Sequence, residues 1–232
     1  MPAPLKLGMV GGGQGAFIGA VHRMAARLDG HWEVVAGALA STPERAQASG
    51  EELGLAAERI YPDFATMASA EATRHDGIDA VSIVTPNHVH FPAAKAFLEA
   101  GIPVICDKPL TSNGEDAAAL AAVVARTGTP FVLTHNYTGY PMIRQARAMV
   151  EAGDLGELRL VHIEYIQDWL SEDLESEGVK QAAWRTDPKQ SGAGGAIGDI
   201  GSHAFNLVSF TTQQRVERLS AQLQSFVPGR RV

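Results

Sequence analysis

The 232-residue sequence predicts an α/β fold: a doubly wound, parallel Rossmann sheet, followed by a partial α+β domain with an open, mainly antiparallel sheet. Over the first 135 residues short apolar runs alternate with amphipathic stretches, the pattern of β-α-β units. These apolar runs are unbroken, as in strands that helices cover on both faces. The pattern changes after residue 135, so we expect one domain over 1–135 and a second, incomplete one over 136–232.

The elements expected in the first domain follow one another closely along the chain. Gly30 ends the first helix and Pro43 opens the second, which are the positions that these residue types favour. The expected strands cover residues 5–10, 34–39, 80–84, 103–106 and 131–134. The expected helices cover residues 16–29, 43 to about 54, 90–100 and 113–127.

The second domain is expected to mix helices with alternating strands. Helices are predicted over 141–151 and 199–211, and period-two alternation predicts strands over 158–167 and 216–227. The sequence stops soon after the last of these patterns, so we expect a C-terminal domain that is truncated. Its last strand would then be an exposed edge.

Composition narrows the classes of function. A formal charge of −7 disfavours a nucleic-acid surface, which needs clustered Lys and Arg. The single cysteine, Cys106, excludes an intramolecular disulfide, and no ligand spacing suggests a metal site. No apolar run is long enough to cross a membrane and no secretion signal stands out, so we expect a cytoplasmic protein.

The first strand runs into a glycine-rich turn, Gly11-x-Gly13-x-x-Ala16, that matches the dinucleotide fingerprint G-x-G-x-x-G/A. Gly11 permits the tight turn and Gly13 lets the backbone approach a pyrophosphate, while the next helix directs free N–H groups at it. A tight turn without a ligand is the alternative. The residues expected to bind cofactor here are Gly11, Gly12, Gly13, Gln14, Ala16, Phe17 and Ile18.

The choice between NAD and NADP stays open in the sequence. Glu33 has the spacing of the ribose-binding acid, but it precedes the second strand and so lies at the wrong end of the sheet. At the correct end stand Ser41, Thr42 and Arg45, a composition that would tolerate a 2′-phosphate. Alternatively, Ser41 or Thr42 only caps the next helix.

Three further motifs place polar residues after strands or on a helix. They are Thr85-Pro86-Asn87-x-x-His90, Cys106-Asp107-Lys108-Pro109-Leu110 and Gly194-Gly195-x-x-x-Asp199-x-x-x-His203. The first two follow strands at the carboxyl edge of the sheet, where open α/β proteins bind ligands. In the third, a spacing of four puts Asp199 and His203 on one helix face. The structural alternatives are a helix cap at Asn87, a surface Lys108–Asp107 pair, and an Asp199 cap beside a core His203.

With the glycine turn, these motifs occur in an order and at a spacing that resembles the Gfo/Idh/MocA family of sugar and inositol dehydrogenases. The resemblance covers essentially the whole chain. It implies a catalytic Lys108, Asp199 and His203. It also implies cofactor contacts from Thr85, Pro86, Asn87, His90, Asp107, Lys108, Trp184 and Arg185, and substrate contacts from Asp199 and His203. Their positions after predicted strands make Asn136, Tyr137, Tyr140, Gln167 and Trp169 further candidates for substrate contact. A purely structural role is the alternative for these five residues and for Trp184 and Arg185.

The resemblance implies an oxidoreductase that exchanges hydride between NAD or NADP and a secondary alcohol of a sugar or polyol. His203 would accept the hydroxyl proton, Lys108 would hold the same oxygen, and Asp199 would set the geometry. The full-length protein is expected to be a homo-oligomer. Two alternatives remain: a redox-neutral, NAD-dependent glycoside hydrolase of the same fold, and a truncated dinucleotide-binding protein without catalysis.

Overall fold

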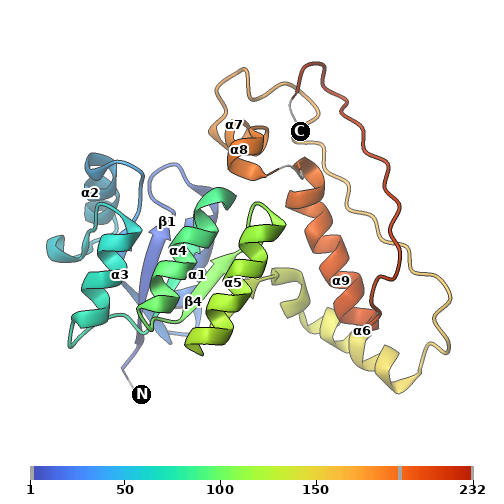
Figure 1. Ribbon diagram of the computed structural model, residues 1–232, viewed down its shortest axis with the longest axis horizontal. Helices are drawn as coiled ribbons and strands as arrows, with labels where there is room; N and C mark the ends of the chain where they lie inside the picture. The colour runs from blue at the N-terminus through green and yellow to red at the C-terminus, as the bar shows by residue number, and fades with distance from the viewer. Residues whose placement is uncertain (1–2, 193–194, 231–232) are drawn as a thin grey trace. The chain divides into compact units, whose positions relative to one another are not determined.

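The computed structural model describes residues 3–192 and 195–230 (Figure 1). The chain divides into two compact units, Met1–Thr134 and His135–Val232, which we describe separately. In the described residues no helix combines the length and apolarity that crossing a membrane requires.

The first unit is built on a five-stranded parallel sheet in the order β2-β1-β3-β4-β5. The strands are β1 (Leu5–Gly11), β2 (Trp32–Ala38), β3 (Ala80–Val84), β4 (Val104–Asp107) and β5 (Phe131–Thr134). This confirms the predicted Rossmann sheet and each of its strands to within about two residues. Because β2 lies on one side of β1 and β3 on the other, the topological switch point falls between the carboxyl ends of β1 and β3.

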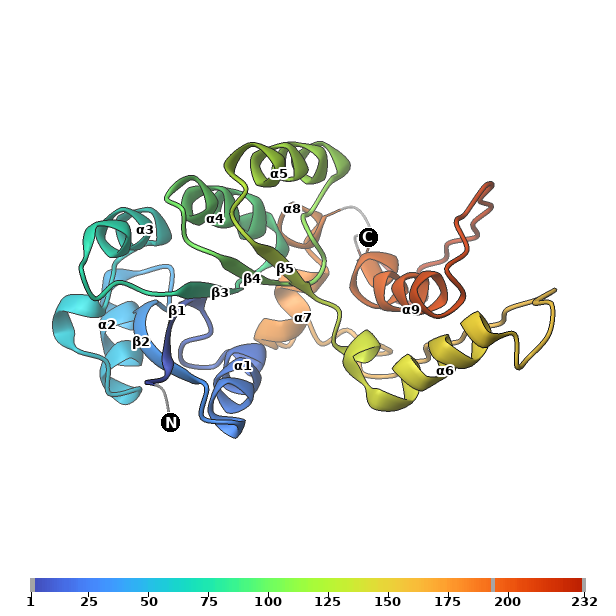
Figure 2. The same ribbon diagram turned by 90° about the horizontal axis from the view of Figure 1, so that it is seen from below.

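Helices cover both faces of this sheet (Figure 2), which explains why its strands are apolar on both sides. One face carries α3 (Phe64–Thr73), α4 (Asn87–Glu99) and α5 (Gly114–Thr127). The other carries α1 (Phe17–Leu28) and α2 (Pro43–Glu52), and a short 3₁₀ turn, η1, covers Ala57–Arg59. Met9, Val81, Ile83 and Phe97 are completely buried and centre the core.

A buried charged cluster ties α3 to the sheet. Glu71 of α3 is 2% exposed, and its carboxylate accepts hydrogen bonds from the guanidinium of Arg59, the hydroxyl of Tyr61 (2.7 Å) and the backbone N–H of Ile78 (3.1 Å). A buried carboxylate is tolerated when its lone pairs are satisfied in this way. Burial and the contact with Glu71 together raise the pKa of Tyr61 to about 12.

The second unit is helical where it is regular. It contains η2 (Asn136–Gly139), α6 (Pro141–Ala152), α7 (Lys180–Arg185), α8 (Pro188–Ser191), the π-helical turn η3 (Ile197–Gly201) and α9 (Ser202–Thr212). The predicted helices at 141–151 and 199–211 are confirmed as α6 and, from Ser202, α9. The guanidinium of Arg147 on α6 lies 4.7 Å from the ring centre of Phe210 on α9, which joins these two helices.

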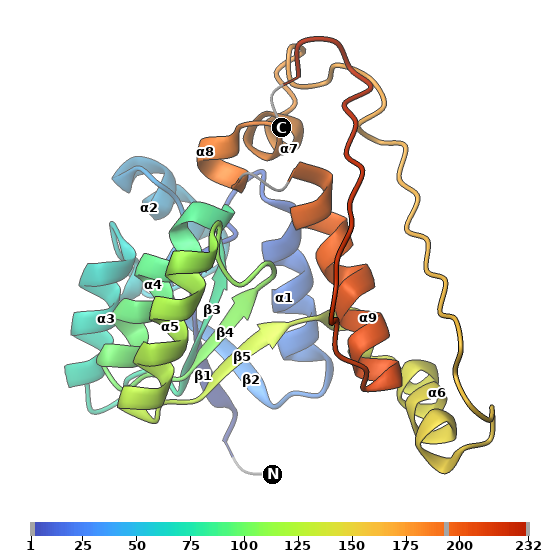
Figure 3. The same cartoon turned by 45° about the vertical axis from the view of Figure 1, so that its right-hand side comes forward.

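The two segments predicted as strands, 158–167 and 216–227, run as long coil segments (Figure 3). Within the described residues neither segment pairs with a neighbouring strand. Their alternating apolar side chains stay exposed, with Leu160 at 87% and Leu219 at 86%. An alternating segment becomes a strand only when a neighbour supplies ladder hydrogen bonds, and no described segment of this chain does so.

Candidate active site

The glycine turn after β1 is held against the end of β2 and against α2. Gly11 and Gly12 have φ values of +79° and +75°, which glycine adopts without strain. The N–H of Gly13 donates to the carbonyl of Leu39 (3.1 Å), and the N–H of Gln14 donates to the hydroxyl of Ser49 (3.1 Å). The turn is therefore a fixed loop at the carboxyl end of β1, beside the topological switch point.

The close approach of helix and turn occurs at Gly19, a residue that the fingerprint reading did not identify. Ala16, the last position of the fingerprint, precedes α1 as its N-cap. A Cβ on Gly19 would lie 2.4 Å from the Cα of Gly12, so only glycine fits there. A glycine inside the amphipathic pattern of a helix was the available signal.

The start of α1 suits an anionic cofactor. The first turn of α1 contains no acidic residue, and no side chain caps it. Its first N–H groups, which lack intrahelical partners, and its positive dipole end can therefore bind a pyrophosphate. Beneath the turn, Arg23 donates to the carbonyl of Gly12 (2.7 Å) and holds that carbonyl on the helix side. Phe17 is 71% exposed at this helix start.

The predicted ribose-binding positions follow β2 and are solvent-accessible. Ser41, Thr42 and Arg45 are all exposed. Thr42 occupies the N-cap position of α2, but its side chain makes no capping hydrogen bond. The alternative that Thr42 is the N-cap of the next helix is therefore confirmed by position, without a capping hydrogen bond from its side chain.

The motif that follows β3 has two parts: a turn at the carboxyl edge of the sheet, and the buried side chain of His90. Asn87 is 5% exposed and begins α4, with Pro86 at the N-cap, so the prediction of Asn87 as the cap is wrong. His90 is 1% exposed. Its Nδ1 lies 2.7 Å from the carbonyl oxygen of Pro109 and its Nε2 lies 3.0 Å from that of Thr85. Both ring nitrogens of His90, a predicted cofactor contact, thus face backbone carbonyls within the protein.

Lys108 follows β4 directly, at the same carboxyl edge of the sheet. Its neighbour Asp107 accepts a hydrogen bond from the hydroxyl of Thr134 at the end of β5 (2.8 Å). Underneath, the Nδ1 of His22 on α1 lies 2.8 Å from the hydroxyl of Ser82 on β3. Burial lowers the pKa of His22, while the charge of Asp107 acts in the opposite direction. His22 carries no predicted role, because nothing in a helical pattern marks a histidine that reaches the sheet.

In the second unit, the imidazole of His203 lies within a cluster of rings, which we call the aromatic cluster: His135, Tyr137, Tyr165 and His203. His203 is 8% exposed, and its ring centre lies 4.7 Å from that of Tyr137, 6.0 Å from that of His135 and 6.3 Å from that of Tyr165. The hydroxyls of Tyr137 and Tyr165 are 2.6 Å apart. This hydrogen bond, with burial as the second cause, raises the pKa of Tyr137 to about 12.

Tyr165 was missed in the sequence, because it lies in an alternating segment without a motif. The predicted Gln167 and Trp169 continue from it: the indole of Trp169 donates to Gln167 (3.3 Å), whose amide donates to the hydroxyl of Tyr165 (3.5 Å). The predicted Tyr140 lies 5.7 Å from Tyr137, ring centre to ring centre. The predicted Asn136 is exposed in η2.

Asp199 is held by Arg185. The carboxylate of Asp199 lies 3.1 Å from Nε of Arg185, whose guanidinium lies 4.2 Å from the ring centre of Trp184 and 5.5 Å from that of Trp169. Asp199 belongs to the π-helical turn η3, which runs directly into α9, the helix that carries His203. Gly194 of this motif lies outside the described residues.

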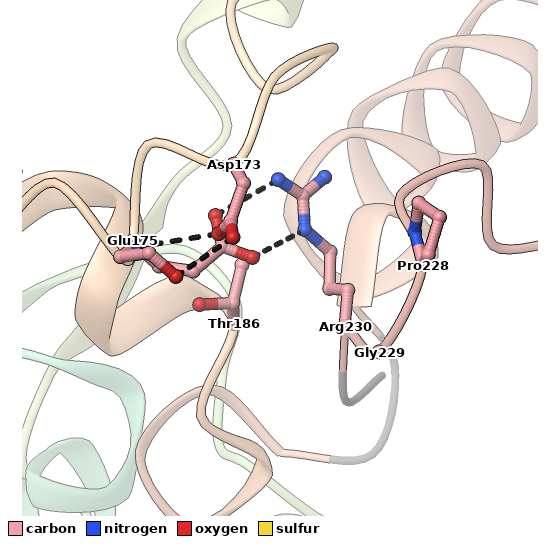
Figure 4. A pocket seen from close by; sticks show the side chains of 7 residues that line it. Asp173, Glu175, Thr186, Pro228, Gly229 and Arg230 are labelled. Atoms are coloured by element: carbon pink, nitrogen blue, oxygen red, sulfur yellow. Dashed lines mark hydrogen bonds and ion pairs between the residues drawn. The ribbon is translucent and has the colours of Figure 1, made fainter.

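One further pocket lies in the second unit, with a cavity volume of about 260 Å³ (Figure 4). The guanidinium of Arg230 extends to the carboxylate of Glu175 (2.6 and 2.8 Å). No predicted site residue lines this pocket, whose walls are Asp173, Glu175, Ser176, Thr186, Pro228, Gly229 and Arg230. Across the described ranges, no group of three or more His, Cys, Asp or Glu residues is arranged to hold a metal ion.

The parallel sheet, the switch-point glycine turn and the uncapped start of α1 define a dinucleotide-binding protein of the Rossmann class. Residues 5–135 match the model of the oxidoreductase family with an NAD-binding Rossmann fold, and residues 143–232 match the GFO/IDH/MocA C-terminal domain. The chain belongs to the Gfo/Idh/MocA family. The prediction of the family is confirmed, as is that of a nicotinamide dinucleotide as the cofactor class.

Relatives align along almost the entire chain. It is 37% identical to the uncharacterized oxidoreductase YfiI of Bacillus subtilis, covering 98% of this chain and 58% of that protein. It is 30% identical to the levoglucosan dehydrogenase of Pseudarthrobacter phenanthrenivorans, covering 97% of this chain and 55% of that protein.

Solved structures are similar over the same extent. An oxidoreductase from Sinorhizobium meliloti has 55% identity and a TM-score of 0.86, covering 99% of this chain and 58% of that one. An inositol dehydrogenase homolog from Azotobacter vinelandii, complexed with NAD+, has 38% identity and a TM-score of 0.88, covering 92% and 55%. The chain thus spans somewhat more than half the length of these relatives.

Proposed function

We propose that this chain belongs to an NAD(P)-dependent oxidoreductase that transfers hydride between nicotinamide and a secondary alcohol of a sugar or polyol. Family membership supports the class of reaction. The names of two relatives, a levoglucosan dehydrogenase and an inositol 2-dehydrogenase, support the class of substrate. The single observation that carries the proposal is the surroundings of His203 in the aromatic cluster.

The aromatic cluster has the chemistry that a polyhydroxylated ring requires. Tyrosine rings offer an apolar face together with a hydroxyl that donates and accepts hydrogen bonds. Like any phenol, that of Tyr137 keeps its proton at neutral pH and can donate to a substrate oxygen. Gln167 and Trp169 extend this polar and aromatic lining.

In the proposed reaction, His203 accepts the hydroxyl proton of the alcohol while Lys108 donates a hydrogen bond to the same oxygen. Histidine suits this task because its ordinary pKa lies near neutrality. Asp199, anchored through Arg185, orients the reacting groups. The bound dinucleotide supplies the acceptor for the hydride, so that the alcohol is oxidised to a ketone.

The residues present fit either nicotinamide dinucleotide. The α1 N-terminus, supported by Arg23 behind Gly12, would hold the pyrophosphate. Ser41, Thr42 and Arg45 would face the ribose, and without an acid there the site would admit a 2′-phosphate as well as a free 2′-hydroxyl. Asp107, Lys108 and the Thr85-Pro86-Asn87 turn are proposed to contact the cofactor further along the same edge.

The test begins with titration of NADH and NADPH by nicotinamide fluorescence, followed by NADH formation from a panel that includes myo-inositol and levoglucosan. His203→Ala is expected to lower kcat by about 10²–10⁴-fold, the usual contribution of a general base. His162→Ala is the matched control, because the His162 side chain is 74% exposed. Equal turnover in the two variants would overturn the role of His203, and tight NADH binding without any polyol oxidation would overturn the proposed reaction.

A further inference from the structure

His90 joins two turns at the carboxyl edge of the sheet in the first unit. It lies near the start of α4, and the two carbonyls that it contacts belong to different strand ends: Thr85 follows β3, and Pro109 follows β4. The distances are 3.0 Å from Nε2 to the Thr85 oxygen and 2.7 Å from Nδ1 to the Pro109 oxygen. Both are hydrogen-bond distances, so one ring connects the two turns.

The chemistry of these contacts constrains the ring. Both partners are carbonyl oxygens, which only accept hydrogen bonds. A neutral imidazole has one N–H and can donate to one of them, whereas an imidazolium donates to both. Desolvation lowers the pKa of His90, the charge of Asp107 on β4 favours the protonated ring, and His88 on the same helix opposes it. Protonation of His90 would therefore satisfy both carbonyl acceptors, but it would also place a positive charge in a buried site, which is unfavourable.

Lys108 lies between two fixed neighbours because of this arrangement. On one side, Asp107 accepts the hydroxyl hydrogen bond of Thr134 (2.8 Å). On the other side, His90 holds the carbonyl of Pro109, whose ring already restricts φ. The peptide that carries the Lys108 side chain is therefore attached to β5 through one neighbour and to α4 through the other.

We propose that His90 is a positioning residue, which sets the place of Lys108 by joining the Pro109 carbonyl to the Thr85 carbonyl across the edge of the sheet. This inference rests on the role proposed for Lys108 in the reaction. It assigns His90 a hydrogen-bonding task within the protein in place of direct contact with the cofactor. Removing the donors of the ring releases the turn that follows Lys108, whereas the glycine turn after β1 keeps its own hydrogen bonds.

The test follows Lys108 itself. Lysines of the whole chain are reductively methylated with a ¹³C label, and the Lys108 resonance is identified by its loss in Lys108→Arg. The ¹³C chemical shift of this resonance at constant pH is then compared in the parent, His90→Gln and His90→Phe, with His75→Gln as control because the His75 side chain is 96% exposed. Phe preserves the volume of the ring without a donor, and Gln preserves one donor.

We expect the Lys108 resonance to change its ¹³C chemical shift most in His90→Phe, less in His90→Gln, and not at all in His75→Gln, because only the His90 variants release the Pro109 carbonyl. The NADH dissociation constant should change less than about threefold, because the glycine turn is held separately. If His90→Phe does not fold, His90→Gln must still move the resonance. An unchanged Lys108 chemical shift in folded His90→Gln, or equal changes in the two His90 variants, would overturn the proposal. Neither measurement uses a substrate, so a failure of the proposed dehydrogenase reaction would leave this test valid.

Discussion

At the residue scale, motifs located the polar residues at strand ends, but they could not show which side chains meet. Lys108, Asp199 and His203 were predicted by type and spacing. Tyr165 and Arg23 belong to no motif, and only the folded chain brings them to Tyr137 and Gly12. The sequence likewise could not show that His90 is buried, because a histidine three residues after an edge turn can point either way.

The hydrogen bond between Tyr137 and Tyr165 has a measurable consequence. Since it is the first cause of the raised pKa of Tyr137, Tyr165→Phe should lower that pKa from about 12 towards the ordinary value of about 10. Titration of the ¹³Cζ resonances of tyrosine measures this shift. Tyr61, whose pKa of about 12 arises from burial and Glu71, serves as an internal control and should not change. A Tyr137 pKa that stays near 12 in the variant would contradict the assigned cause.

The same shift predicts how stability depends on pH. Between about pH 10 and pH 12 the folded state keeps the Tyr137 proton that the unfolded state releases. The contribution of Tyr137 to stability is therefore complete below about pH 10 and is lost as the pH rises towards 12. The free energy of unfolding of the parent should fall more steeply over this interval than that of Tyr165→Phe. Urea unfolding at several alkaline pH values measures both slopes, and identical slopes would count against the linkage.

At the scale of elements, periodicity was sufficient where helices and parallel strands alternate. The five strands of the sheet and most helices of the first unit were predicted, because each is bounded by Gly, Pro or a cap. The helix α3 was not, since its Ala-rich sequence has no clear apolar stripe; Asp63 caps it by accepting from the N–H of Thr66 (2.8 Å). For 158–167 and 216–227, alternation could not reveal whether a partner strand is present.

The attachment of α3 through Glu71 gives a prediction about stability. Glu71→Leu removes one partner of a buried ion pair, which typically costs about 3–5 kcal/mol, and leaves the guanidinium of Arg59 with only the more distant carboxylate of Asp76 (3.8 Å). Glu99→Leu is the matched control: it breaks an ion pair with Arg126 whose side chains are 40% and 61% exposed, and such pairs contribute about 0–1 kcal/mol. Urea unfolding followed by circular dichroism compares the two. Similar losses would show that Glu71 does not stabilise the first unit as a buried ion pair.

At the scale of the whole molecule, the order of four short motifs was enough to predict the family. Each motif marks the end of a strand or the start of a helix. The order of the motifs therefore indicates the order of these elements along the chain. The substrate is different: the side chains proposed to contact it include Tyr165 and Trp169, from a segment with no regular structure. That is why sequence predicts a polyol or sugar as a class and leaves the particular compound to experiment.

We proposed that Lys108 and His203 serve one hydride transfer between an alcohol carbon and nicotinamide. A decisive measurement uses myo-inositol or levoglucosan deuterated at its carbinol carbons, with mass spectrometry of the NADH that is formed. We expect NADH carrying one deuterium from the parent chain and from His162→Ala, and a strong loss of labelled NADH from His203→Ala and Lys108→Ala. Unlabelled NADH, or undiminished labelling in His203→Ala and Lys108→Ala, would contradict it.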